Sequence, residues 1–241
     1  MISIVYRPDL EAYAKRLSAL IGAEPLSCSK RPDLTVVVGG DGTLLSAIHT
    51  HPCVLDSVVL HVGGGKINFF SAIRVGEAPL EEIARRITSG DFRVIELPTI
   101  DAGCTAVNEV VVRNADYKKL LSFKLYGDSL SIDGRADGVI ISTPQGSTGY
   151  ALSAMAPIVD FRINAFIIAF IAPFTLYLRP LIVPPGELWV EAFQDAVLVC
   201  DGYEELRDRK FLIRPGARRL KMAVFGDFDY GERVAARLIA R

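Results

Sequence analysis

The chain has 241 residues, half of them hydrophobic, and a formal net charge of −1. This length is enough for one large domain or two modest ones with a substantial core. Because the charges nearly cancel, the composition offers neither the basic excess typical of nucleic-acid binding nor a polybasic block for anionic lipid. We therefore expect neither nucleic acid nor a membrane among the partners.

The N-terminus lacks the basic start and the long apolar run of a signal peptide. The most apolar tract, residues 165–174, is too short to span a bilayer. We therefore expect a soluble cytoplasmic protein. Four cysteines have no CxxC spacing, which argues against a zinc site or a disulfide framework and favours small core or near-surface residues. They are Cys28, Cys53, Cys104 and Cys200.

Up to Gly90 the pattern alternates between buried strands and amphipathic helices. Continuous apolar, β-branched runs are typical of strands buried on both faces, and apolar residues at helical spacing predict the helices between them. Strands are predicted at residues 2–5, 34–38 and 58–62, and helices at 10–21, 43–51 and 80–87. This alternation predicts a parallel sheet with helices on its faces.

After about Asp91 short β-rich runs follow one another and predict a second, mostly antiparallel β domain. Asp-Gly pairs at 133–134, 137–138 and 201–202 are turn signals. The predicted strands are 106–112, 120–126, 129–132, 138–142, 163–172, 188–193, 197–200, 211–213 and 220–225. The tail from Tyr230 has weak helical spacing.

A glycine-rich turn with one carboxylate lies where the second predicted strand gives way to a helix. It reads Gly39-Gly40-Asp41-Gly42-Thr43. Glycines allow positive φ and close approach to a phosphate, and a helix N-terminus favours anions. The carboxylate can hold a metal or take a proton, so the turn favours phosphoryl transfer. Plainer interpretations are a tight turn, a turn-stabilising aspartate and a threonine that caps the helix.

Commoner phosphate-binding motifs are missing. The chain has no GxxxxGK[ST] motif, and no GxGxxG follows a predicted strand. Gly63-Gly64-Gly65-Lys66 follows the third predicted strand and is a candidate for a second glycine turn, with Lys66 either at phosphate or simply exposed. A second cluster, residues 146–150, is rich in small residues and hydroxyls and ends at Tyr150, whose ring offers a face to a nucleotide.

Together these stretches resemble the NAD kinase family, and the likeness covers most of the chain in the same order. The glycine-Asp turn is shared with diacylglycerol kinases, sphingosine kinases and phosphofructokinases. The longer stretch from Ser142 to Ser153 is typical of NAD kinases. Its form resembles that of archaeal members. The matching motifs are residues 39–43, Asn108-Glu109, residues 135–138, residues 142–153, residues 179–184 and Asp201-Gly202.

The resemblance implies an N-terminal Rossmann-like α/β domain over residues 1–92 and a C-terminal β-sandwich domain over 93–228. A tail, 229–241, can pack back on the N-terminal domain. It further implies transfer of a phosphoryl group from ATP or polyphosphate to the adenosine ribose 2′-hydroxyl of NAD, giving NADP. A divalent metal, Mg²⁺, and a homo-oligomer, dimer or tetramer, are implied as well. The sequence identifies neither the metal ligands nor the donor.

Site residues follow from the same resemblance. Asp41 is implied as the proton acceptor, and the turn around it as the phosphate-binding segment. The implied phosphate-binding residues are Gly39, Gly40, Gly42 and Thr43. The implied NAD-binding residues are Asp41, Gly42, Asn108, Glu109, Arg135, Asp137, Thr148, Gly149, Tyr150, Ala151 and Ser153. Asp201 falls in a loop that reaches ligand in relatives.

Three departures from the family pattern stand out. Relatives usually have Gly-Val-Asn-x-Gly-x-Leu-Gly-Phe-Leu where this chain has residues 61–70, so Asn68 replaces a glycine. Asn tolerates the left-handed conformation better than most residues. Gln145 stands where Thr is usual, and Phe174 where many relatives have His. We expect none of the three histidines to be a ligand or a catalytic group.

Two other functions remain as alternatives. One is a lipid or sugar kinase with the same glycine-Asp turn, against which the stretch 146–153 counts. The other is a dinucleotide-binding regulator without turnover, against which Asp41 and the Asn108-Glu109 pair count.

Overall fold

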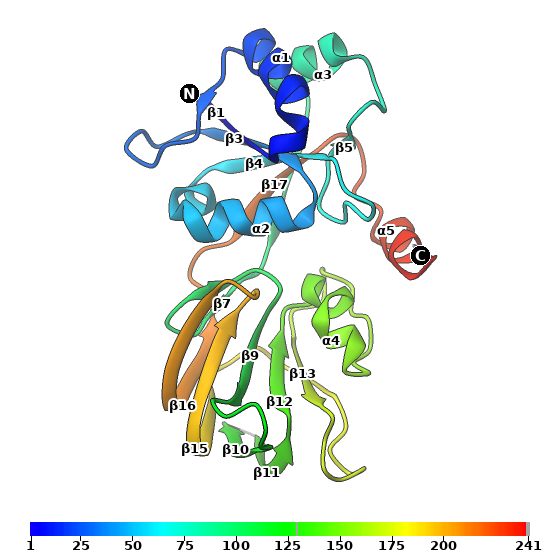
Figure 1. The fold of residues 1–241 in the computed structure, drawn as a ribbon. Helices are drawn as coiled ribbons and strands as arrows, with labels where there is room; N and C mark the ends of the chain where they lie inside the picture. The colour runs from blue at the N-terminus through cyan, green and yellow to red at the C-terminus, as the bar shows by residue number, and fades with distance from the viewer. Residues whose placement is uncertain (129, 240–241) are drawn as a thin grey trace. The chain divides into compact units, whose positions relative to one another are not determined.

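The computed structural model describes residues 1–128 and 130–239 (Figure 1). Ser129, the first residue of one predicted strand, lies outside the described residues, as do residues 240 and 241 of the tail. The chain divides into two compact units. The first comprises Met1–Leu97 together with Arg218–Arg241, and the second comprises Pro98–Ala217.

The first unit is built on a mostly parallel sheet with the strand order β2-β1-β3-β4-β17-β6. β1, β2, β3, β4 and β17 pair in parallel, β5 pairs in parallel with β4, and β6 is antiparallel to β17. The strands are β1 (Ile2–Tyr6), β2 (Glu24–Pro25), β3 (Leu34–Gly39), β4 (Val58–Gly63), β5 (Ile73–Arg74), β6 (Arg93–Leu97) and β17 (Leu220–Val224).

Helices cover both faces of this sheet. Figure 1 shows α1 and α3 on one face and α2 on the other. α1 and α3 each end at a glycine in the left-handed conformation, Gly22 and Gly90. The helices are α1 (Glu11–Ile21), α2 (Asp41–Thr50), α3 (Leu80–Ser89) and α5 (Tyr230–Ile239), with 3₁₀ turns η1 (Pro8–Leu10) and η2 (Pro52–Asp56).

The division between the units differs from the expected boundary at residues 92 and 93. β6 and β17 were expected in the β domain, but β17 lies between β4 and β6 in the first unit's sheet. β17 follows the whole second unit in the sequence, yet it pairs with β4 of the first unit. Such a long-range parallel pairing leaves no local signature in the strand pattern.

The second unit is an antiparallel sheet with the order β14-β13-β12-β9-β15-β16-β7-β8, in which β10 pairs with β15 and with β11. Its strands are β7 (Ile100–Asp101), β8 (Thr105–Ala106), β9 (Glu109–Asn114), β10 (Leu121–Gly127), β11 (Leu130–Ala136), β12 (Gly138–Ser142), β13 (Phe166–Ile171), β14 (Leu181–Val183), β15 (Leu188–Cys200) and β16 (Glu204–Pro215). After β12 come the 3₁₀ turn η3 (Gln145–Thr148) and the short helix α4 (Tyr150–Ser153).

The long strand β15 folds this sheet into two layers. Its first part pairs with β10 and its second with β9, and the register shifts between Glu191 and Ala196. Side chains of the two layers then meet in one core, where the ring of Phe123 on β10 stacks on that of Phe170 on β13 at 5.9 Å. The predicted fold class, an α/β domain followed by an antiparallel β-sandwich domain, is confirmed.

Only one of the predicted Asp-Gly turns forms a hairpin. Asp201 and Gly202 both have positive φ, 49° and 80°, and connect β15 to β16. The turn predicted at Asp133-Gly134 is wrong, because both residues lie within β11. A Cβ on Gly134 would lie 2.7 Å from Phe123 Cζ, so this glycine makes room for a core ring.

The expectation of four small, separate cysteines is wrong. Cys28 is bonded to Cys53, and Cys104 to Cys200, across 25 and 96 residues. The partners meet only because η2 approaches the loop after β2, and the loop between β7 and β8 approaches the end of β15. No helix among the described residues combines the length and the apolarity needed to cross a membrane.

Candidate functional site

Two glycine loops leave the sheet side by side at the ends of β3 and β4. Gly39 and Gly63 are paired in register, and Gly64 N–H donates to the Gly39 carbonyl at 2.7 Å. A Cβ on Gly65 would lie 3.1 Å from Gly40 Cα. The second glycine turn that the sequence suggested therefore exists, and it touches the first one backbone to backbone.

The glycines of the first loop do not adopt the left-handed backbone conformation. Gly39 is needed because neighbouring atoms approach its backbone closely. The freedom of glycine to take positive φ is not used here, since Gly39, Gly40 and Gly42 are absent from the positive-φ residues of the described chain. A Cβ on Gly39 would lie 2.3 Å from Thr43 Oγ1. A Cβ on Gly42, in contrast, would meet nothing within 4 Å, so the first turn of α2 has open space at that position.

α2 begins at Asp41 with Gly40 as its N-cap, and no side chain caps it. The interpretation of Thr43 as the capping residue is therefore wrong. Thr43 lies within the first turn, and its N–H donates to the Gly40 carbonyl at 2.9 Å. The positive end of the helix dipole is directed at the loop, as an anion-binding segment requires.

Asp41 is held by the second loop and not by its own turn. Phe69 N–H donates to Asp41 Oδ2 at 2.9 Å, and Phe70 N–H donates to Oδ1 at 3.2 Å. The side chain is 25% exposed. Each carboxylate oxygen keeps a second lone pair, so the group stays able to accept a proton from a ligand hydroxyl.

His61, on β4, lies beside Asp41. The imidazole Nε2 is 2.8 Å from the Gly39 carbonyl, and Nδ1 is 3.9 Å from Asp41 Oδ1. Burial lowers the pKa of His61, and the charge of Asp41 opposes this. The ring is therefore neutral, with its proton on Nε2, because a carbonyl can only accept. Sequence reasoning gave His61 no role, although a histidine inside an apolar strand was a signal.

Asn68, which replaces a family glycine, has a backbone conformation that favours glycine. Its φ is 55°, in the left-handed region that Asn tolerates. Its side chain bonds back to Gly65, accepting from the N–H at 2.7 Å and donating to the carbonyl at 2.6 Å. This departure therefore leaves the loop intact, ahead of the two phenylalanines that hold Asp41.

Arg7, which sequence reasoning missed, lies against the same loops. Its Nη2 donates to the Gly64 carbonyl at 3.0 Å and to Asp9 Oδ2 at 2.7 Å. Arg7 also lines a cavity of about 280 Å³ together with Gly42, Thr43 and Ser46. A guanidinium and the N-terminus of α2 thus border one small hollow, where both favour an anion.

In the second unit, Asp201 fixes the backbone of the Asn108-Glu109 pair. Its carboxylate accepts the N–H groups of Val107 at 2.7 Å, Asn108 at 2.8 Å and Glu109 at 3.1 Å. Asp201 therefore forms the hairpin turn and also binds the backbone of residues 107–109. Asp201 positions the residues that the sequence predicts to bind NAD.

The stretch after β12 closes over the Asn108 carbonyl. Thr143 N–H donates to it at 2.8 Å, and Ser142 Oγ at 3.1 Å. A Cβ on Gly146 would lie 2.2 Å from this oxygen, so only glycine fits. Gln145, a departure from the family threonine, has a structural reason: its Nε2 bridges the carbonyls of Pro98 and Val107 at 2.7 and 2.8 Å.

Glu109 is a buried carboxyl with an altered charge state. Burial, with the charge of Asp201 as a second cause, raises its pKa from 4.5 to about 8. The group is therefore mainly protonated at neutral pH and can donate a hydrogen bond. Its Oε2 lies 3.1 Å from where a Cβ on Gly149 would be, so the structure brings these two predicted binding residues together.

The remaining predicted residues around α4 fall into two kinds. Thr148 and Ala151 are buried, and Thr148 Oγ1 donates to the Gln145 carbonyl at 3.1 Å. Tyr150 and Ser153 are exposed. Thr148 and Ala151 therefore stabilise the conformation of this segment, whereas Tyr150 and Ser153 are accessible to a ligand.

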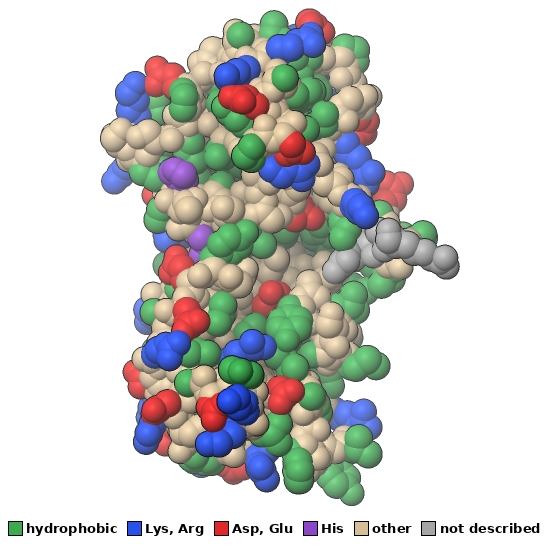
Figure 2. All heavy atoms as spheres, viewed as in Figure 1, with side chains coloured by type: hydrophobic (Ala, Val, Ile, Leu, Met, Phe, Trp, Pro, Cys, Tyr) green, Lys and Arg blue, Asp and Glu red, His purple; other side chains and the backbone are tan. Residues whose placement is uncertain are grey.

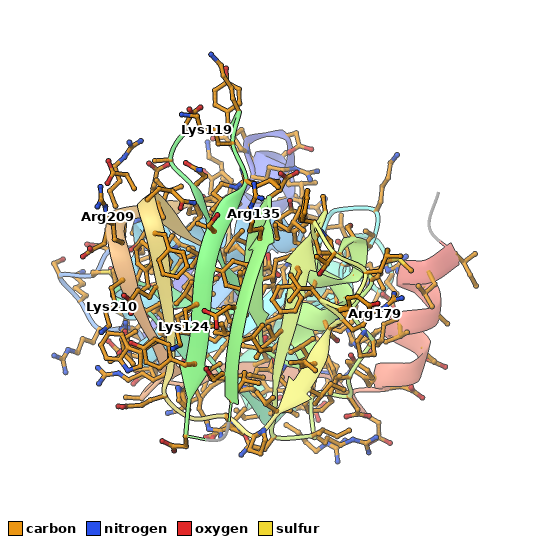
Figure 3. All side chains as sticks on the ribbon, turned by 90° about the horizontal axis from the view of Figure 1, so that it is seen from below. Lys119, Lys124, Arg135, Arg179, Arg209 and Lys210 are labelled. Carbon is orange, nitrogen blue, oxygen red and sulfur yellow. A yellow bond between two sulfur atoms is a disulfide. The ribbon has the colours of Figure 1, made fainter. Side chains whose placement is uncertain are left out.

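Arg135 and Asp137 lie apart from the other predicted residues of this unit. Ser142 pairs with Glu109, and Gly138 pairs with Arg113 at the opposite end of β12. The two ends are about 13 Å apart at the usual rise of a strand. Arg135 is stacked over the Phe174 ring at 4.8 Å. It lines a cavity of about 840 Å³ with residues that include Lys118, Lys119 and Asp195 (Figure 3).

Among the described residues, no three or more His, Cys, Asp or Glu side chains gather into a metal-binding group. Mg²⁺ in phosphoryl-transfer sites is usually held by one or two carboxylates and by substrate phosphates. Within the two glycine loops themselves, residues 39–43 and 63–70, the carboxylate is that of Asp41, which suits a metal that arrives with the phosphates.

Comparisons with known proteins bear on the family and on the fold. Residues 107–211 match the family model of the ATP-NAD kinase C-terminal domain. An NAD kinase from Thermococcus sibiricus is 36% identical over 82% of this chain and 75% of the relative. Two solved structures share the fold. They are an NAD kinase from Archaeoglobus fulgidus in complex with ATP (TM-score 0.83, 22% identity, 98% of both chains) and yeast NADH kinase complexed with NADH (TM-score 0.85, 19% identity, 99% of this chain and 86% of that one).

Proposed function

The chain belongs to the NAD kinase family, and from this premise we propose which of its residues perform the reaction. The activity is that of a phosphotransferase, which phosphorylates the adenosine ribose 2′-hydroxyl of NAD to give NADP. The observation that carries our assignment is Asp41, held by two backbone N–H groups at the N-terminus of α2.

Asp41 is the proton acceptor in our proposal. The 2′-hydroxyl oxygen attacks the terminal phosphorus of the donor in line, the bond from that phosphorus to the leaving phosphate oxygen breaks, and the hydroxyl proton passes to Asp41. The transition state of such transfers is loose, so positioning and charge neutralisation supply most of the catalysis. The hydrogen bonds from Phe69 and Phe70 fix the carboxylate before the substrate arrives.

We place the donor phosphates at the first turn of α2. Gly39, Gly40, Gly42 and Thr43 form this segment, and Arg7 borders the adjoining cavity. The donor is ATP or polyphosphate. When bound, Mg²⁺ would neutralise charge on the transferred phosphoryl group, and Asp41 would be its carboxylate partner from the protein.

NAD binding falls to the second unit in our proposal. Asn108 and Glu109 are held by Asp201, and Gly149 lies against the Glu109 carboxyl. Because Glu109 is protonated at neutral pH, it can both donate to and accept from ribose hydroxyls or base nitrogens. Thr148, Tyr150, Ala151 and Ser153 complete the segment assigned to the dinucleotide.

We also propose that the protein is a homo-oligomer. Arg135 and Asp137 precede β12, whose two ends are about 13 Å apart and whose other end pairs with Glu109, so they lie outside the cluster around Asn108 and Glu109. Next to them, Phe174, Leu176 and Tyr177 are strongly exposed, and apolar side chains are visible on the surface of this unit (Figure 2). Sedimentation of the native chain tests this: a monomer at micromolar concentration contradicts it, and Leu176→Glu should shift an oligomer towards monomer.

One assay tests the function. The pure chain is incubated with NAD, Mg²⁺ and either ATP or polyphosphate, and NADP is measured. Asp41→Asn should lower turnover by about 10²–10⁴-fold, the usual contribution of a general base. Since an asparagine can accept only one of the two N–H groups, its NAD affinity is measured separately. A variant with near-normal turnover would remove Asp41 from its assigned role.

A further inference from the structure

The C-terminal helix α5 reaches the loop that holds Asp41. Arg233, in the first turns of this helix, donates from Nη1 to the Phe69 carbonyl at 2.6 Å. The two residues are 164 positions apart in sequence. Nothing in the motifs of the chain points to Arg233, since it lies beyond the last of them, Asp201-Gly202.

The C-terminal segment encloses Arg233 and Phe69 together. The guanidinium lies 4.0 Å from the centre of the Phe228 ring. The Phe69 ring meets the rings of Phe228 and Tyr230 edge to face, at 6.4 and 5.8 Å. Stacking on a ring and packing around the stem restrict the guanidinium to one orientation, so its hydrogen bond needs little further ordering.

The bond from Arg233 and the bond to Asp41 share one peptide group. Phe69 supplies the carbonyl that accepts from Arg233, and Phe70 supplies the N–H that donates to Asp41 Oδ1 at 3.2 Å. The carbonyl and the N–H of a peptide point in opposite directions within one plane. A guanidinium on the carbonyl side therefore holds the N–H on the Asp41 side. It also polarises the peptide and strengthens its second hydrogen bond.

We propose that Arg233 is a positioning residue for Asp41, acting through the peptide between Phe69 and Phe70. The inference rests on the proposed role of Asp41 as proton acceptor. The other charged groups near Arg233 are Arg74, Asp229 and Glu232, and they line a cavity of about 310 Å³ with it, together with Glu77 and Asp227. Small solutes can therefore reach the guanidinium site.

A purely structural role, in which Arg233 only anchors α5, is the competing explanation. Arg86 provides a matched control. It also projects from a helix of the first unit and lies over a ring, 4.1 Å from the centre of Phe225, and its Nε donates to Asp91 at 3.1 Å. Loss of Arg86 should lower stability as loss of Arg233 does, but without an effect on turnover.

The test compares Arg233→Met with Arg86→Met. We expect Arg233→Met to lower kcat by about 10- to 100-fold, the effect of a slightly misplaced catalytic group, with KM for NAD and for the donor within about twofold, because no substrate contact is lost. Arg86→Met should keep kcat. Added guanidinium should restore part of the kcat of Arg233→Met, and Arg233→Lys should lose less than Arg233→Met.

A double-mutant cycle with Asp41→Asn completes the test. If Arg233 acts through Asp41, adding Arg233→Met to Asp41→Asn should cost much less than it costs alone. Additive losses, or equal losses in Arg86→Met, would overturn the inference. If Asp41→Asn itself keeps turnover, the proposed role of Asp41 fails instead. If Arg233→Met does not fold, Arg233→Gln replaces it, because glutamine keeps an aliphatic side chain and a neutral hydrogen-bond donor. The same double-mutant cycle is then measured with Arg233→Gln.

Discussion

His61 Nδ1 lies 3.9 Å from Asp41 Oδ1, on a side chain that solvent does not reach. Its other nitrogen donates to the Gly39 carbonyl, which also accepts from Gly64 N–H at 2.7 Å. The imidazole therefore hydrogen-bonds the last residue of β3 and packs beside the side chain of the first residue of α2. The hydrogen bonds to the carboxylate itself come from the backbone of Phe69 and Phe70.

The pH dependence of stability should report His61. Burial lowers its pKa in the native state, whereas the unfolded residue takes up a proton below about 6.5. The unfolded state then binds more protons, so the free energy of unfolding falls as pH drops below about 6.5. The His61→Gln variant should lack this decrease in the free energy of unfolding at low pH. The His51→Gln variant should still show it. Urea unfolding between pH 5 and 7.5 measures it; identical profiles for all three proteins would contradict the argument.

Glu109 should have the opposite effect. Its pKa is about 8 in the native state and 4.5 ordinarily. Between these values the native state binds more protons than the unfolded state, so the free energy of unfolding falls as pH rises from about 4.5 to about 8. Glu109→Gln removes this loss. The variant should gain stability relative to the native chain as pH rises through that range.

The matched control for this measurement is Glu187→Gln, an exposed change in the same unit. It should follow the native chain at every pH. A stability difference between Glu109→Gln and the native chain that does not vary with pH would show that Glu109 is already ionised at neutral pH.

Arg7 should matter for the donor and not for NAD. A hydrogen bond to a charged group contributes about 1.5–3 kcal/mol, so Arg7→Met should raise the KM for ATP or polyphosphate by about 10- to 100-fold. The KM for NAD should stay near its native value, because Arg7 borders the cavity at Gly42 and Thr43. Arg16→Met, an exposed change on α1, is the control. Equal changes in both KM values would place Arg7 outside the donor site.

The two disulfides should contribute unequally to stability. In the chain-entropy model, the bond that closes the longer loop, Cys104–Cys200, contributes about 4–5 kcal/mol, and Cys28–Cys53 about 3–4 kcal/mol. Cys104→Ser with Cys200→Ser should therefore lower the free energy of unfolding more than Cys28→Ser with Cys53→Ser. Denaturant unfolding with and without reductant measures both. No response to reductant in the native chain would show that the bonds are not formed in solution.

Local sequence patterns were sufficient to predict the alternating first unit and the β-rich second unit. The strand-to-helix change at Gly39, the helix stops at Gly22 and Gly90 and the hairpin turn at Asp201 all depend on residues close together in the chain. Side-chain periodicity and turn chemistry act at this range, which is why they can be read without coordinates.

Tertiary structure alone decided the contacts between distant segments. β17 joins the first sheet, Cys104 meets Cys200, and Asp41 takes its hydrogen bonds from Phe69 and Phe70. Arg233 reaches the same loop from the end of the chain. None of these follows from spacing, because each depends on which backbone and side-chain groups the topology brings together. The sequence by itself determined that a carboxylate stands in a glycine-rich turn between a strand and a helix, and the folded chain determined what holds that carboxylate in place.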